Sequence, residues 1–104
     1  MRQVIQGKVY DTETARLLFL WTNSRYPNDF RYREKALYRT PKGAFFLLHQ
    51  GGPMTDMAVS VGGNDFSGSS RIEPISKGEA LAFLESHGGT DVILTEFPAD
   101  VEEA

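Results

Sequence analysis

Six consecutive residues, Ala44 to His49 with the sequence AFFLLH, most constrain how this 104-residue chain can fold. Successive side chains of a strand point to opposite faces of a sheet, so this segment would be apolar on both faces. Such a strand lies in the middle of a sheet and needs cover on both sides. We therefore expect a central strand over 44–50, with a helix over one face. The cover of the other face stays open between the leading strand, a second helix and another molecule.

The segment before it predicts the partner strand of an antiparallel hairpin. Thr40–Pro41–Lys42–Gly43 is a four-residue turn sequence, with proline at a fixed φ and glycine at an expected positive φ. In the predicted strand 30–39, one face is aromatic or apolar and the other is basic. The even positions include Phe30, Tyr32, Ala36 and Tyr38, and the odd positions include Arg31, Arg33, Lys35 and Arg39.

Two segments predict helices. In 12–22, Asp11 or Thr12 can cap the first turn, and the large apolar residues that follow indicate a core helix buried nearly all round. In 76–88, Ser76 and Glu79 have the spacing of a capping box, apolar residues fall on one face, and Gly88 is placed to close the helix.

The remaining segments predict shorter elements. We expect one strand over 3–10 with a bulge at Gly7, and an edge strand over 71–75, because Pro74 cannot donate to a central ladder. Residues 62–70 predict a loop in which Phe66 packs back onto the protein. The sequence does not decide whether 54–61 forms a helical turn or a strand, or whether 90–98 is a helix or a strand. It predicts a frayed acidic tail over 99–104.

Together these elements predict one small α+β domain, with a three- to four-stranded antiparallel sheet packed with two main helices. At 40% hydrophobic residues the chain can build a single core. We expect no membrane segment and a cytoplasmic location, because no stretch approaches about 18 uncharged apolar residues and the chain reaches Lys8 without an apolar signal core. The absence of cysteine excludes disulfides and thiolate metal sites.

Charge is distributed unevenly along the chain. Residues 1–55 carry a formal charge of +5 and residues 56–104 carry −8, which together give the overall −3. This asymmetry indicates either two faces that attract each other when the chain folds or two surfaces that recognise different partners.

No catalytic motif stands out. Residues 63–70 have the glycine spacing of a phosphate loop but Ser69 in place of the lysine that binds phosphate. Ser60, His49 and Asp56 could be combined as a hydrolytic triad, but no nucleophile-elbow sequence supports them. We therefore expect neither an enzyme nor a small-molecule substrate, and no cofactor or bound metal.

Two binding surfaces are candidates. A mainly acidic set could attract a basic protein surface and compete with nucleic acid for it: Asp65, Phe66, Glu73, Asp91, Glu96, Asp100, Glu102 and Glu103. A basic set could instead follow a phosphate backbone: Arg31, Arg33, Lys35, Arg39 and Lys42. The acidic overall charge makes nucleic acid the second choice.

The order of several segments resembles a family of small proteins carried by phages and other mobile elements. These are KVYDTETA (8–15), SRYPNDFRYREKALYRTPKGAFFL (24–47), GGPMTDMAVSVGGNDFSGS (51–69), IEPIS (72–76) and EALAFLESHGG (79–89), which cover most of the chain. This sequence departs from the family by having phenylalanine at Phe66 and Phe83, where members often have tryptophan.

The resemblance extends to anti-CRISPR proteins directed at type I systems. It implies a stoichiometric inhibitor that binds a Cas subunit of the surveillance complex and blocks target DNA binding, without chemistry of its own. Two alternatives stay open: a nucleic-acid-binding accessory protein that uses the basic face of 30–39, and a dimerising structural module. Monomer and weak dimer are both compatible with the sequence.

Overall fold

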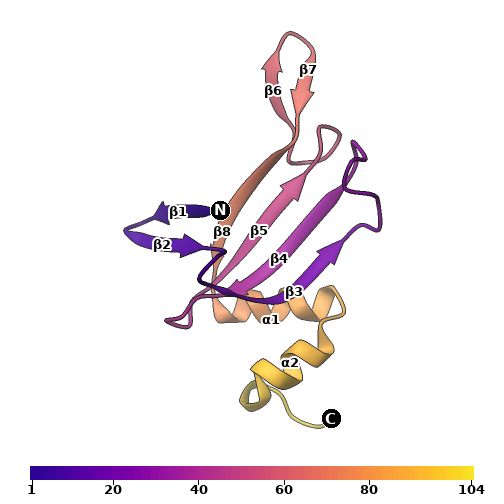
Figure 1. Cartoon of the computed structure of the whole chain (residues 1–104). Coiled ribbons are helices and arrows are strands. Elements are labelled where there is room, and N and C mark those ends of the chain that lie inside the picture. Colours follow the sequence, from indigo (N-terminus) through magenta and orange to yellow (C-terminus); the bar gives the residue numbers. More distant parts are fainter.

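The central strand lies where the apolar run predicts it. In the computed structural model, which describes all residues 1–104, β5 (Phe45–Gly51) is flanked by β4 (Arg33–Arg39) and β8 (Ser69–Ile75), and β3 (Arg16–Thr22) completes the order β3-β4-β5-β8. All neighbouring strands are antiparallel. The expected α+β fold with a four-stranded antiparallel sheet is therefore confirmed (Figure 1).

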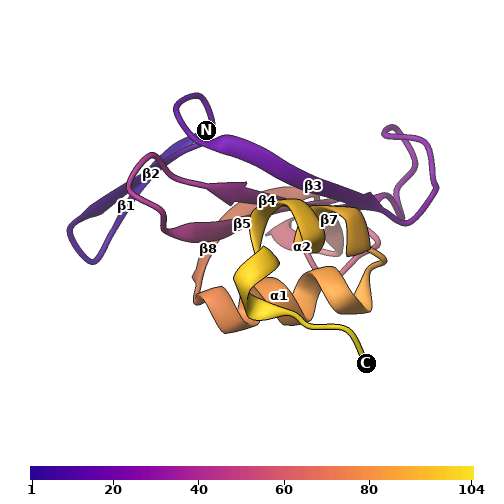
Figure 2. The same cartoon turned by 90° about the horizontal axis from the view of Figure 1, so that it is seen from below.

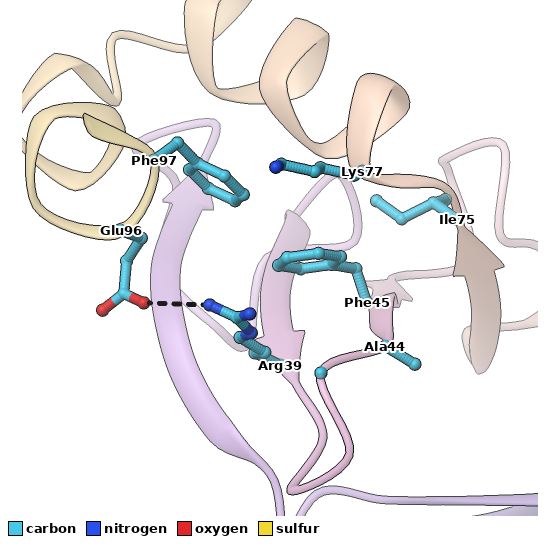
Figure 3. Close-up of a pocket in the computed structure, with 8 residues that line it drawn as sticks. Arg39, Ala44, Phe45, Ile75, Lys77, Glu96 and Phe97 are labelled. Carbon is cyan, nitrogen blue, oxygen red and sulfur yellow. Dashed lines mark ion pairs between the residues drawn. The ribbon is translucent and has the colours of Figure 1, made fainter. Parts of the chain in front are cut away.

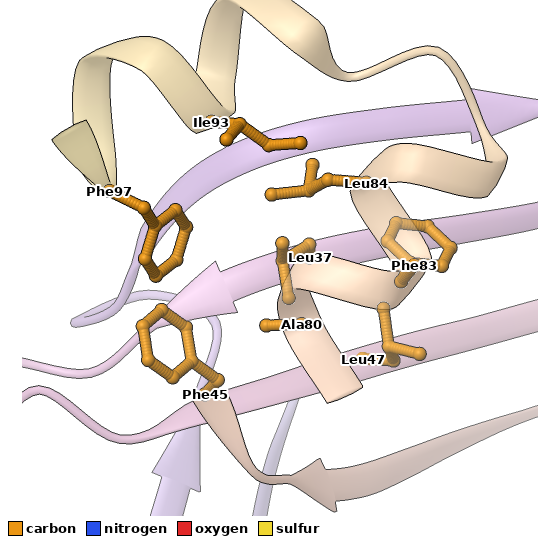
Figure 4. Packing of buried hydrophobic residues seen from close by; sticks show 8 residues of the cluster. All are labelled: Leu37, Phe45, Leu47, Ala80, Phe83, Leu84, Ile93 and Phe97. Atoms are coloured by element: carbon orange, nitrogen blue, oxygen red, sulfur yellow. The ribbon is translucent and has the colours of Figure 1, made fainter. Parts of the chain in front are cut away.

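The two faces of β5 contribute to different apolar clusters. Phe45 and Leu47 point toward helices α1 (Lys77–Ser86) and α2 (Thr90–Glu96), which lie on one side of the sheet (Figure 2). Around these two residues gather Leu37, Ala80, Phe83, Leu84, Ile93 and Phe97, as Figure 4 shows. This cluster is the main core of the protein.

Phe46 and Leu48 point to the opposite face, whose cover the sequence left open. Tyr10 packs edge-on against Phe46, with ring centroids 5.6 Å apart, and Tyr38 stacks on Phe46 at 5.1 Å. Ala36 and Ile72 are also buried in this second cluster. Its cover therefore comes from the N-terminal hairpin and from a tyrosine of the neighbouring strand.

The helix predicted over 12–22 is wrong, because most of this segment forms the edge strand β3. The predicted helix start at Asp11 does form, but it extends no further than one turn. The Asp11 carboxylate accepts a hydrogen bond from the Glu13 amide at 2.9 Å, and the Asp11 carbonyl accepts one from the Ala15 amide at 3.0 Å. These bonds make a single turn. Pairing with β4 places Phe19 and Trp21 against the helices. A bulge at Leu18 shifts the register of the strand, so its apolar residues no longer alternate regularly and resemble those of a helix buried on all sides.

The N-terminal segment is a hairpin, so the single strand predicted over 3–10 is also wrong. β1 (Arg2–Ile5) and β2 (Lys8–Asp11) pair only with each other. Gln6 and Gly7, the two residues between them, have φ of 50° and 77°, as a two-residue primed turn requires. Gly7 therefore belongs to a turn, and no bulge forms there.

The open segment 54–61 becomes a strand from Val59, and with part of 62–70, where the sequence predicts a loop, it forms a second projecting hairpin. β6 (Val59–Gly62) pairs with β7 (Asp65–Ser67) beyond one end of the main sheet (Figure 1). The Phe66 side chain is 57% exposed, so the expectation that it packs back is wrong. With two hairpins extending from the body, the radius of gyration is 15.3 Å, compared with about 13 Å for a compact chain of this length.

The C-terminal third begins as predicted. The Ser76 hydroxyl accepts a hydrogen bond from the Glu79 amide, the Glu79 carboxylate accepts one from the Ser76 amide, and Gly88 follows the helix with φ of 80°. The open segment 90–98 is helical, as α2, and a short 3-10 turn, η1 (Pro98–Asp100), follows it. The edge strand predicted over 71–75 is confirmed within β8, and Pro74 lies in it.

The strand predicted over 30–39 begins later than expected. Phe30 and Arg31 lie in a turn, where the Asp29 carboxylate accepts a hydrogen bond from the Arg31 amide at 2.7 Å, and β4 starts at Arg33. Phe30 is exposed and does not join an aromatic strand face.

Candidate protein-binding surface

The helical layer, which we define as residues 76–104, is strongly acidic. It carries seven carboxylate side chains and a single lysine, Lys77. Two of the acids are used inside the protein: Asp100 pairs with Lys77 at 2.8 Å, and Glu96 pairs with Arg16 and Arg39. The other five are exposed and form no ion pair within the chain: Glu79, Glu85, Asp91, Glu102 and Glu103.

These five acids come from neighbouring parts of the fold. Glu79 and Glu85 lie on exposed positions of α1, Asp91 lies in the first turn of α2, and Glu102 and Glu103 follow η1. Both helices and the C-terminus lie on the same side of the sheet (Figure 2). We call these five residues the acidic face.

Sequence reasoning identified only part of this surface. It singled out Asp91, Glu102 and Glu103 but omitted Glu79 and Glu85. Their position on the helix side away from Ala80, Phe83 and Leu84 was visible in the same periodicity that predicted the helix. Glu79 also serves the capping box, and its hydrogen bond from the Ser76 amide lowers the pKa of its carboxyl group.

The remaining acidic candidates lie elsewhere or are occupied. Asp65 is in the β6–β7 hairpin with Phe66, away from the helical layer (Figure 1). Glu73, on β8, hydrogen-bonds His49. Glu96 receives two hydrogen bonds from Arg16, including one of 2.8 Å from Nη2, and these bonds are the largest cause of its lowered carboxyl pKa. The predicted acidic residues therefore do not form one surface, because some lie in a separate hairpin and others are held in contacts within the protein.

The predicted basic residues are separated even further, and most of them are buried or engaged in contacts within the protein. Arg33 is buried, and Lys35 lies over the Trp21 ring with Nζ 5.5 Å from the centroid. Arg39 lies 3.6 Å from Glu96 and 5.2 Å from the Phe45 ring centroid, where it lines a cavity of about 260 Å³ between the sheet and α2 (Figure 3). Of the five, only Arg31 and Lys42 are exposed, one in each of two separate turns. The strand thus offers no continuous basic track.

Ion pairs between the two halves of the sequence explain much of the charge asymmetry. Arg16, Arg33 and Arg39 from the basic half pair with Glu96 or Asp56 from the acidic half. This finding supports the interpretation that the two halves attract each other on folding. It applies to the basic half more than to the acidic face, which has no internal partner.

A polar network crosses one end of the sheet and uses the residues considered for a triad. Arg33 Nε donates to Asp56 Oδ1 at 2.7 Å, and Arg33 Nη2 donates to His49 Nδ1 at 2.8 Å. Because arginine only donates, Nδ1 is the acceptor and Nε2–H donates to Glu73 Oε1 at 2.8 Å. Both nitrogens of His49 are therefore engaged, and no hydrogen bond joins it to Ser60.

Burial keeps His49 neutral within this network. Desolvation is the largest cause of its lowered pKa, and the nearby Arg33 and Arg71 charges act in the same direction, while Glu73 opposes them. The bond from Arg33 likewise lowers the pKa of Asp56. These contacts fasten the 52–58 turn to the sheet.

Comparison with protein-family models, with curated proteins and with solved structures gives no match. No helix has the length and apolar character needed to cross a bilayer. No three His, Asp or Glu side chains are grouped closely enough to hold a metal ion.

Proposed function

We propose that this protein is a stoichiometric inhibitor of a type I CRISPR surveillance complex and that it acts in the cytoplasm of the bacterial host. In this proposal the acidic face binds a lysine- and arginine-rich surface of a Cas subunit and keeps target DNA away from it. The observation that carries the proposal is the acidic face itself, with five exposed carboxylates and no cation of the chain paired with them. The resemblance of the sequence to mobile-element proteins supplies the biological setting.

The chemistry of the competitor supports this choice of mechanism. A surface that binds DNA does so mainly through lysine and arginine contacts to phosphates. A set of carboxylates carries the same sign of charge as DNA phosphates, so the protein and DNA would compete for one channel. The helices α1 and α2 hold Glu79, Glu85 and Asp91 in place, because buried side chains of both helices belong to the main core.

The test is co-elution of the purified protein with reconstituted type I surveillance complexes of several subtypes, with labelled target DNA added before or after the protein. We expect a stable complex that no longer binds DNA when the protein is added first. Co-elution that leaves DNA binding intact would exclude the proposed mechanism. Failure to co-elute with any subtype, together with salt-sensitive DNA binding by the protein alone, would favour the nucleic-acid-binding alternative.

A charge-reversal variant then locates the binding surface. Glu85→Lys combined with Asp91→Lys changes only exposed side chains without ion-pair partners, so the fold should persist. Reversal of Glu96 or Asp100 is less informative, because it would also break the contacts to Arg16, Arg39 and Lys77. We expect the double variant to bind the complex at least tenfold more weakly, since close charge pairs at interfaces couple by about 1.5 kcal/mol or more.

A further inference from the structure

The two edges of the main sheet differ in how they are protected. β8 contains Arg71, Glu73 and Pro74, and charges and proline, like the bulge that interrupts β3 at Leu18, are means of preventing an edge strand from pairing with another chain. β3 has neither a charge nor a proline between Leu17 and Thr22, where the sequence is LLFLWT, so apart from the bulge nothing in its sequence protects it. Leu17 and Leu20 are each about half exposed, at 48% and 50%. Between Leu17 and Thr22 the β3 edge is thus uncharged and mainly apolar.

The backbone along this edge is available for pairing. β3 pairs only with β4, and the Asn23 amide donates to the Arg33 carbonyl at 3.1 Å. Because antiparallel ladders alternate, the amides of Trp21 and Phe19 then also point toward β4, and those of Leu20 and Thr22 point away from it. No group of the chain hydrogen-bonds to the outward-facing backbone N–H and C=O groups of Leu20 and Thr22; the Ser24 amide donates only to the Thr22 side-chain hydroxyl.

We propose that a second copy of this chain pairs with β3 in antiparallel fashion, with Leu20 at the two-fold axis. Leu20 of one copy then lies opposite Leu20 of the other, Phe19 opposite Trp21, and Arg16 opposite Ser24. Opposite residues of an antiparallel pair share one face, so Phe19 and Trp21 both remain on the helix side. No charged side chain meets a like charge in this register.

Self-pairing fits this edge better than a foreign strand does. The Leu17–Thr22 stretch of the edge carries no charged side chain that could select a different sequence, and the Arg16 charge at its end is already paired with Glu96, whereas a two-fold pair is complementary to itself by construction. The bulge at Leu18 confines regular pairing to a few residues on each chain. The contact is therefore small, and we expect a weak dimer whose population depends on concentration.

The first test is sedimentation velocity of the full chain over a concentration series from roughly 10 μM to 1 mM, which spans weak association. We expect the average mass to rise from 11.6 kDa toward twice that value. Leu20→Lys should keep the protein monomeric throughout the series. The matched control Val61→Lys adds the same charge at a 63% exposed apolar position on the β6–β7 hairpin and should behave like the wild type.

Cysteine cross-linking gives a second readout that does not depend on a disruptive substitution. The chain contains no cysteine, so a single Leu20→Cys change introduces the only thiol. A residue opposite its own copy has its Cα about 5.5 Å from the partner Cα, within the range that a disulfide spans. We expect mild oxidation to link Leu20→Cys chains into dimers and to leave Val61→Cys chains largely unlinked.

Three outcomes would overturn the proposal. They are a wild-type protein that stays monomeric over the whole series, a dimer that Val61→Lys disrupts but Leu20→Lys does not, and equal cross-linking of the two cysteine variants. None of these measurements involves a CRISPR complex, so they are independent of the proposed function.

Discussion

Individual polar residues decide how one end of the sheet holds together. Arg33 is buried yet fully hydrogen-bonded, since its guanidinium reaches Asp56, His49 and two backbone carbonyls. A buried charge is tolerated only when it is paired in this way. His49 is the neutral acceptor in the network, and its protonation would place a second cation beside Arg33.

The lowered pKa of His49 predicts a loss of stability as the solution becomes acidic. The unfolded chain, with a histidine pKa of about 6.5, binds a proton at higher pH than the folded protein does. The contribution is therefore fully present above pH 6.5 and declines as the pH falls toward the folded-state pKa, by about 1.4 kcal/mol for each unit of pKa difference. Urea unfolding at several pH values between 7.5 and 5 measures this slope.

His49→Gln is the control, because glutamine keeps a polar side chain that does not titrate. We expect the variant to be less stable at pH 7.5 but to lose most of the slope between pH 6.5 and 5. An unchanged slope in the variant would show that other groups cause it.

Gly68 and Gly78 form a matched pair for testing close backbone packing. A Cβ at Gly68 would lie 2.3 Å from the Gly51 carbonyl oxygen, whereas one at Gly78, in the first turn of α1, would meet only the Ser76 hydroxyl at 3.9 Å. We expect Gly68→Ala to cost about 1–3 kcal/mol through overpacking and Gly78→Ala to stabilise by up to about 1 kcal/mol through helix propensity. Equal effects in thermal unfolding would contradict this account of the packing.

At the scale of elements, the two hairpins behave differently. The β1–β2 hairpin contributes Tyr10, which is buried against Phe46. The β6–β7 hairpin contributes no residue to either apolar cluster and exposes Val59, Val61 and Phe66. The first hairpin is therefore part of the core, and the second is an appendage.

Two phenylalanine substitutions test this distinction. We expect Phe46→Ala to destabilise the protein by about 3–5 kcal/mol, because this ring is completely buried between two tyrosines. Phe66→Ala should change the free energy of unfolding by less than about 0.5 kcal/mol, as for other surface substitutions. A large loss of stability from Phe66→Ala would show that the ring packs back in solution.

Elements with local signals could be predicted from the sequence, and those set by distant pairing could not. The capping box of α1 and the two-sided apolar run of β5 identify themselves, because their signals lie within a few residues. β3 was predicted as a helix because a bulge at Leu18 disturbs its alternation and because its pairing with β4 is invisible in the local pattern. In the candidate site, exposure could be inferred for Asp91 and Glu102, but the engagement of Glu96 by Arg16 joins residues 80 positions apart.

At the scale of the whole molecule, the charges separate into an internal set and an external set. Arginines of β3 and β4 neutralise Glu96 and Asp56 within the fold, and Lys77 neutralises Asp100. Among the acids of the helical layer, the five residues of the acidic face are those that no cation of the chain neutralises, and the two helices that carry three of them lie on one side of the sheet (Figure 2). The net charge of −3 thus understates the local charge that a partner would meet.

The most direct test of the acidic face measures the concentration of protein that displaces half of the target DNA from a responsive type I complex. This concentration is compared between the wild type and two variants that have equal net charge. Glu85→Gln with Asp91→Asn, and Glu13→Lys alone, each raise the net charge by two, but only the first pair changes the acidic face. We predict that the neutralised pair requires several-fold more protein than the wild type and that Glu13→Lys requires the same amount as the wild type. Equal displacement by all three proteins would contradict the claim that the acidic face competes with DNA.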